Sequence, residues 1–228
     1  MHKAKIFYFT VFILAVIAFI FHVTAMGHHH WKHVTGENIT VTGFNRTTIG
    51  LFTRCVPSDT HYGETCFPNT YPVIHRACLW SYCQNKNLTE NCGCDYLPST
   101  KGIAACAIIA AVFLGISIIL LFIHSIKTNE TSVTAILLSF LPLVLLFLAF
   151  IFILITLILV GSYLLRDMMA VFRTIFDDDS WENARNRARA AYTVRIGWAS
   201  GLEIIALVFT FFSFILYCLF VFKLGRSQ

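Results

Sequence analysis

Four long apolar runs dominate the hydrophobic pattern of this chain, and polar segments separate them. Each run is close to or longer than the ~20 residues that a helix needs to cross the hydrocarbon core of a bilayer. We therefore predict four transmembrane helices. They cover residues 6–26, 103–126, 133–165 and 196–222.

The two longer polar segments have different local patterns. In the first, residues 38–43 alternate polar with β-branched side chains, and Gly and Pro interrupt the rest of the segment, which is typical of short strands. In the second, Ser180 is a candidate helix N-cap, and good helix formers run from Trp181 into the fourth apolar run. We predict a small sheet in the first segment and an unbroken helix from Trp181 onward. The third apolar run exceeds the bilayer thickness, so its helix should project outward, with Pro142 as a candidate bend.

Composition and chemistry then orient the chain. It is 57% hydrophobic and 13% charged, far from the balance of a soluble domain. The first polar segment holds six of the eight cysteines and three N-glycosylation sequons, which together indicate the oxidising secretory lumen and hence the cell exterior. The sequons begin at Asn38, Asn45 and Asn87, and the cysteines are Cys55, Cys66, Cys78, Cys83, Cys92 and Cys94.

The predicted fold class is an all-α membrane protein, a four-helix transmembrane bundle with a small disulfide-stapled extracellular β-sheet in the first loop. With that loop outside, both termini and the turn between the second and third spans face the cytoplasm. The cytoplasmic segments are residues 1–5, 127–132 and 223–228, and the extracellular loops are residues 27–102 and 166–195.

Two features of the sequence argue for other topologies. The first span resembles a signal peptide, because Lys3 and Lys5 precede it and small residues follow it, yet its apolar stretch exceeds the usual ~7–15-residue signal core. We therefore predict that it is retained. Only five of the 17 Lys and Arg residues fall on the cytoplasmic side, which opposes the positive-inside rule. We give the sequons and cysteines more weight, so a fourth sequon at Asn129 should stay unmodified.

Three groups in or near the spans are candidate sites, each with a plain structural alternative. Glu203 is the only acid deep in an apolar run, and such carboxylates either mark function or form hydrogen bonds in the packing. Gly197 and Gly201 are four residues apart and permit close helix approach, either inside the bundle or to a partner. A histidine group just outside the first span is either a metal or proton site or a solvated turn. Its members are His28, His29, His30 and His33.

The second loop and the fourth span add weaker candidates. Asp177, Asp178 and Asp179 are suited either to a hard cation or to a helix start. Cys218 is either palmitoylated or a quiet buried thiol. Four arginines form either a recognition surface or a solvated helix. They are Arg185, Arg187, Arg189 and Arg195.

A spaced set of residues in the first loop resembles the signature of the claudin superfamily, which also includes peripheral myelin and epithelial membrane proteins and channel gamma subunits. The set is Trp31, Gly50, Leu51, Phe52, Cys55 and Cys66, with Lys101 before span two and Gly197-Trp198 opening span four. The resemblance implies a Cys55–Cys66 disulfide and a sheet that Trp31, Leu51 and Phe52 seat at the bilayer interface. This chain departs from the pattern by having Phe52 in place of a Trp, four additional cysteines and a C-terminal Gln.

The resemblance implies two functions. The first is that of a lateral auxiliary subunit of a channel or receptor in the plasma membrane, and the second is cell–cell adhesion or a paracellular junction barrier. Three potential glycans would obstruct close membrane apposition, which favours the lateral role. We expect the lipid bilayer and a membrane protein or a second copy as partners, with no nucleic acid and no cofactor, and we assign no metal. No enzyme motif is present, so we predict a non-enzymatic protein.

Overall fold

The computed structural model describes residues 2–36, 46–57, 63–72, 94–126, 133–164 and 181–225. The chain divides into two compact units. The helical unit comprises residues 1–25, 105–157 and 201–228, and the loop unit comprises residues 26–104 and 158–200. The three loop sequons, three of the additional cysteines, Asn129 and the aspartates at 177–179 lie outside the described residues.

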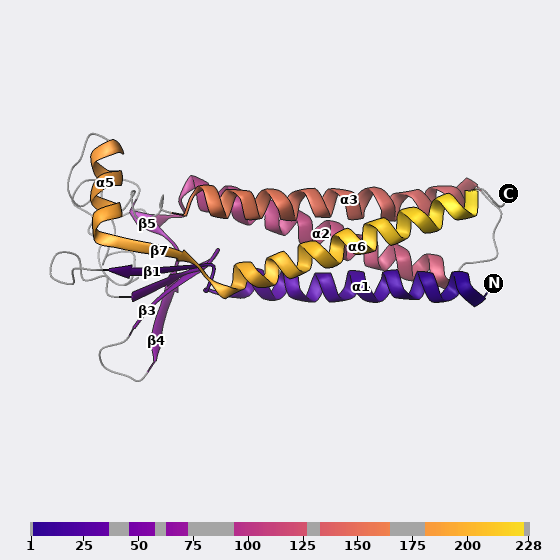
Figure 1. The fold of residues 1–228 in the computed structure, drawn as a ribbon, viewed down its shortest axis with the longest axis horizontal. Helices are drawn as coiled ribbons and strands as arrows, with labels where there is room; N and C mark the ends of the chain where they lie inside the picture. Colours follow the sequence, from indigo (N-terminus) through magenta and orange to yellow (C-terminus); the bar gives the residue numbers. More distant parts are fainter. Residues whose placement is uncertain are drawn as a thin grey trace. The chain divides into compact units, whose positions relative to one another are not determined.

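Four long helices carry the apolar runs, and Figure 1 shows them side by side through the helical unit. They are α1 (His2–Gly27), α2 (Pro98–Ile126), α3 (Val133–Ser162) and α6 (Trp198–Gly225). Each has a stretch long and apolar enough to cross a membrane, which confirms the four predicted spans and identifies a multi-pass membrane protein. With 30 residues, α3 is about 45 Å long. It continues as a helix through Pro142.

Small and polar residues line the inner face of α6, and large apolar residues cover its outer face. Glu203, Ala206 and Tyr217 are fully buried, whereas Ile204 and Val208 are 51% and 45% exposed. The spacing of three and four residues puts each set on one side of a 3.6-residue helix. Inward small residues let the helices approach closely, and outward branched residues match the lipid tails. The bundle core also includes Tyr8, Val11, Ala15, Leu114, Leu121, Leu146 and Ile153.

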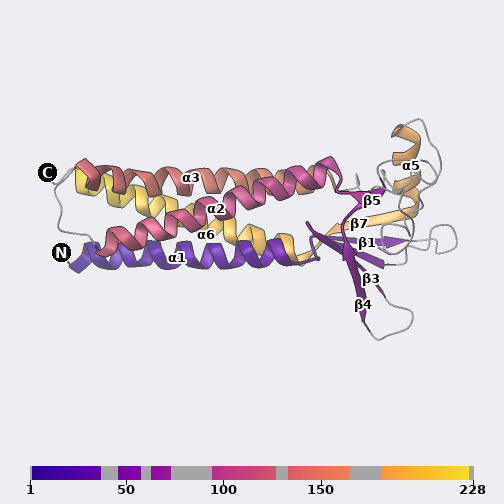
Figure 2. The same ribbon diagram turned by 180° about the vertical axis from the view of Figure 1, so that it is seen from behind.

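The loop unit contains a five-stranded antiparallel sheet (Figure 2). Its strands lie in the order β4-β3-β2-β1-β7. They are β1 (Lys32–Gly36), β2 (Arg46–Ile49), β3 (Thr53–Pro57), β4 (Glu64–Pro68) and β7 (Tyr192–Ile196). A second, two-stranded sheet pairs β5 (Tyr71–Pro72) with β6 (Cys94–Asp95). The predicted small sheet is therefore confirmed, with one strand from an unexpected place.

The unexpected strand is β7, which corrects the prediction of an unbroken helix from Trp181. Helix α5 (Trp181–Ala191) ends where β7 begins, and β7 pairs with β1 from Lys32↔Ile196 to Gly36↔Tyr192. The local sequence explains the change, because Tyr192 to Ile196 is rich in aromatic and β-branched residues, whereas α5 is rich in Ala and Arg. The second loop thus contributes the edge strand beyond β1.

Candidate functional site

A buried His–Glu pair joins three helices of the helical unit. His22 of α1 and Glu203 of α6 are both fully buried. Nδ1 of His22 lies 2.8 Å from Oε1 and 2.9 Å from Oε2 of Glu203, and Nε2 lies 2.9 Å from the Ala107 carbonyl oxygen of α2. Glu203 therefore has the hydrogen-bonded packing role that its sequence position left open, and its partner is a histidine.

The contacts of this pair fix its proton count. A carbonyl oxygen can only accept, so Nε2 of His22 must carry a hydrogen and donate it to Ala107. One further proton must lie between Nδ1 and the Glu203 carboxyl group, since two lone pairs at 2.8 Å would repel. The pair is thus either imidazolium with carboxylate or imidazole with carboxylic acid. Both forms carry no net charge, which suits a membrane interior where an isolated charge is costly.

The buried threonine hydroxyls of the bundle bond within their own helices. The Thr156 hydroxyl donates to the Phe152 carbonyl at 2.9 Å, and the Thr210 hydroxyl donates to Ala206 at 2.7 Å. Such bonds satisfy the hydroxyl but link no two helices. The His22–Glu203 pair differs from these hydroxyls because its hydrogen bonds link α1 with both α2 and α6.

The sequence pointed to Glu203 but missed His22. Both lie in apolar runs, and a histidine in such a run is a polar group that needs a partner once buried. The available signal was one ionisable group in span one and one in span four, each near the end that faces the cysteine-rich loop. With the antiparallel order of the spans, those positions fall at a similar depth.

In the loop unit, the residues that follow α1 form a turn of three histidines. His28, His29 and His30 each offer a ring nitrogen, and these three atoms lie within 4.8 Å of one another. The rings also contact Trp198, whose centroid is 4.2 Å from that of His28 and 5.6 Å from that of His30. The three side chains are half-buried, so the group is not a fully solvated turn.

Charge and burial act on this histidine turn. Nε2 of His29 lies 3.2 Å from Oε2 of Glu64 on β4. Burial, together with the neighbouring His29 and His33, lowers the pKa of His30 below its usual range. His30 therefore favours the neutral imidazole, which is the form that binds metals. His33, on β1, contributes a ring 5.1 Å from that of His30.

Two glycines allow the histidine turn to pack closely. A Cβ at Gly50 would lie 2.6 Å from the Cα of His29, and a Cβ at Gly197 would lie 2.0 Å from the carbonyl oxygen of His30. Backbone hydrogen bonds hold the two segments together at Gly197. The Gly197 N–H donates to Trp31 O at 2.8 Å, and the Ala199 N–H donates to His30 O at 3.1 Å. The turn thus accepts hydrogens from the start of α6, whose first N–H groups have no partner within the helix.

Several of the first-loop residues on which the claudin resemblance rests are buried. Trp31, Leu51 and Cys55 are 1%, 3% and 1% exposed, so they belong to the interior of the loop unit. The protein itself covers Trp31 and Leu51, and the expected seating of the sheet at a bilayer interface stays a prediction. Phe52, in contrast, is 37% exposed.

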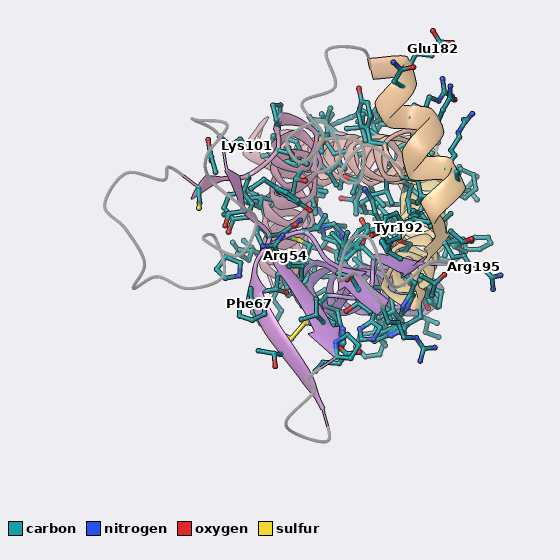
Figure 3. The ribbon with its side chains drawn as sticks, turned by 90° about the vertical axis from the view of Figure 1, so that its left-hand side faces the viewer. Arg54, Phe67, Lys101, Glu182, Tyr192 and Arg195 are labelled. Carbon is teal, nitrogen blue, oxygen red and sulfur yellow. A yellow bond between two sulfur atoms is a disulfide. The ribbon has the colours of Figure 1, made fainter. Side chains whose placement is uncertain are left out.

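The expected disulfide joins two strands of the five-stranded sheet. Cys55 and Cys66 are directly opposed on β3 and β4 and are bonded, and Figure 3 draws this bond. Cys94 is also disulfide-bonded. Among the described residues, Cys106 and Cys218 are free thiols.

Two of the basic residues that oppose the positive-inside rule have structural roles in the loop unit. Arg54, labelled in Figure 3, is 1% exposed on β3, with its guanidinium 5.2 Å from the centroid of the Tyr71 ring. Burial lowers the pKa of Arg54, and Tyr71 partly offsets this effect. Lys32 is 5% exposed and donates to Tyr163 O at 3.0 Å. Sequence reasoning missed both, since a basic residue in a short strand has no distinctive local pattern.

The arginines of the second loop are placed differently. Arg185 and Arg189 are exposed on α5, and Arg195 is exposed on β7 (Figure 3). Arg187 lies on α5. The first three are accessible to a partner, as a recognition surface requires, but equally to solvent.

No protein-family model and no curated protein matches this sequence.

Proposed function

We propose that this chain is a claudin-like plasma-membrane protein that acts by protein–protein association, as a lateral auxiliary or regulatory subunit of a channel or receptor. The observation that carries the proposal is an open glycine on the outer face of α6. A Cβ added at Gly201 would meet no atom within 4 Å. At Gly197, by contrast, the backbone of His30 occupies the space that a side chain would need. The two glycines that looked alike in sequence therefore have different surroundings.

The position of Gly201 on the helix supports a partner of the same membrane. At about 100° per residue, Gly201 lies within roughly 40° of Ile205 and Val208 and nearly opposite the buried Glu203. Nothing in the described bundle uses the lack of a side chain at Gly201. In a bilayer, a small residue on an outer face lets another helix approach closely, and association depends on such close packing. A partner helix is the occupant that this face fits.

Lateral association is tested by contact mapping on full-length protein in cells. A photoreactive residue at Val208 should cross-link one co-expressed membrane protein, and Gly201→Leu should abolish the product. Gly161→Leu is the matched control, because a Cβ added at Gly161 on α3 would likewise meet no atom within 4 Å. Equal cross-linking in the two variants, with both eluting as folded protein, would contradict a partner at this face.

The alternative function is adhesion, and strand β4 is the observation that favours it. This strand ends the sheet, and Glu64, Thr65 and Cys66 are exposed along it. An edge strand can pair with a strand of another molecule, although Glu64 and Pro68 are residue types that hinder such pairing. Aggregation of cells that express the protein, lost when residues 63–68 are replaced and unaffected by Gly201→Leu, would favour adhesion over a lateral role.

A further inference from the structure

The strongest remaining cluster is the histidine turn at residues 28–30. We propose that His28, His29 and His30 bind one divalent transition-metal ion of the zinc class, each through one ring nitrogen, with Glu64 orienting His29. The site is independent of the outer face of α6 and therefore of the proposed lateral function.

Unpartnered ring nitrogens are the first reason for this assignment. Nδ1 of His28 and Nδ1 of His30 are both shielded from solvent and have no hydrogen-bond partner. A buried polar atom without a partner is uncommon and costs free energy, so two of them side by side require an explanation. A bound cation would satisfy both nitrogens at once.

The position of Glu64 supplies the second reason. Its Oε2 lies 3.2 Å from Nε2 of His29, so the carboxylate accepts a hydrogen from Nε2 and leaves Nδ1 with a lone pair. Histidine ligands are commonly held in this way by a carboxylate on the other ring nitrogen. The Nδ1 atom of His29 is therefore available as a ligand, in addition to those of His28 and His30.

The geometry is compatible with a small ion. Zinc–nitrogen bonds of about 2.0–2.1 Å at tetrahedral angles place two ligand nitrogens about 3.3 Å apart. The ligand nitrogens here lie within 4.8 Å of one another. Ring rotations that move each nitrogen by about 1 Å would bring them to the spacing that zinc requires. Three imidazoles leave a fourth position for water and favour Zn²⁺, Cu²⁺ or Ni²⁺ over Mg²⁺ or Ca²⁺, which prefer oxygen.

The backbone around the turn is already fixed, which lowers the cost of ordering the ligands. Gly50 and Gly197 admit the turn at distances that no side chain would allow, and Trp198 packs on two of the rings. A site whose supports are in place needs little reorganisation on binding. The cluster therefore differs from histidines that are merely adjacent in a mobile segment.

Metal binding is tested on the full chain, purified in mild detergent with a histidine-free affinity tag and treated with EDTA. Zn²⁺ titration followed by elemental analysis should give one ion per chain, and Co²⁺ should give the visible spectrum of a four-coordinate site. Mg²⁺ should not compete. Failure of Zn²⁺ to bind the folded protein above the level seen with Mg²⁺ would overturn the proposal.

Variants locate the ion. His30→Gln should abolish binding, and Glu64→Gln should weaken it by about 10- to 100-fold because it removes only the orienting carboxylate. His124→Gln, with its histidine in α2, is the matched control and should bind as the parent does. If His30→Gln does not elute as a single folded species, Glu64→Gln decides, since Glu64 is 43% exposed and its replacement leaves the core intact. Unchanged affinity in folded Glu64→Gln, or loss of the ion in His124→Gln, would refute this site.

Discussion

Replacing Glu203 by Gln and by Ala separates a hydrogen-bonding role from a role that needs the carboxylate. In the structure, Glu203 supplies a partner for Nδ1 of His22, and Ala107 O holds the opposite ring nitrogen. A Gln amide can donate to Nδ1 while His22 stays neutral and keeps its bond to Ala107. The replacement retains the size of the side chain and the absence of net charge, so we expect a loss of no more than about 1 kcal/mol in the free energy of unfolding.

The truncations should cost more. Glu203→Ala leaves Nδ1 of His22 buried without a partner, which costs about 1–3 kcal/mol, and the cavity adds to that figure. His22→Ala leaves the Glu203 carboxyl group buried without its partner. A protonated carboxyl group avoids the loss of about 3–5 kcal/mol in stability that an unpaired buried charge would cause. Hydrogen bonds between membrane helices average only about 0.6 kcal/mol, because the unfolded chain also finds partners there. We therefore place both truncations near 2 kcal/mol, at the middle of the range for an unsatisfied group.

The measurement is reversible unfolding in mixed micelles, with helix content followed against the SDS fraction. The double variant His22→Ala/Glu203→Ala completes the cycle, and a coupling energy of about 0.5–3 kcal/mol is expected for groups in direct contact. Two results would refute the reasoning. One is a Glu203→Gln variant as unstable as Glu203→Ala, which would show that the ionised carboxylate itself is required. The other is additivity of the two truncations, which would show that the pair does not join the helices.

Three further predictions concern the loop unit and the topology. Gly197→Ala should block folding and surface delivery, because its methyl group would overlap a backbone oxygen, whereas Gly63→Ala meets open space and should be neutral in a surface-expression assay. Cys66→Ser should lower stability by about 3 kcal/mol through the freed 11-residue interval, and Cys218→Ser should not change denaturant midpoints. Deglycosylation should raise gel mobility, and a triple sequon variant should remove that change; occupancy of Asn129 instead would invert the topology. The triple variant replaces Asn38, Asn45 and Asn87.

The four spans were predictable because twenty or more apolar residues in succession have few other uses. Helix ends were less predictable, and α2 begins at Pro98 rather than at the first residue of its apolar run. Proline fits the first turn of a helix, where its missing N–H is not needed. Pro98 is therefore a helix-start signal, but a hydropathy profile does not detect it.

Interactions between distant segments escaped the sequence. Strand β7 follows a helix without any turn signal, and its pairing with β1 stabilises the extended conformation. His22 and Glu203 are likewise visible singly, but only the packing of α1 against α6 makes them a pair. The different surroundings of Gly197 and Gly201 also arise only in three dimensions. Their spacing of four residues does not reveal which glycine packs against another segment and which faces open space.

The pairing of β7 with β1 has a consequence for how the protein is made. Strand β1 follows α1, and β7 precedes α6, so β1 is synthesised well before the strand that pairs with it. Until β7 is synthesised, one edge of β1 lacks its partner strand, and open edges are where other strands and chaperones attach. A chain truncated before Tyr192 would therefore leave this edge of β1 permanently unpaired and open to such attachment.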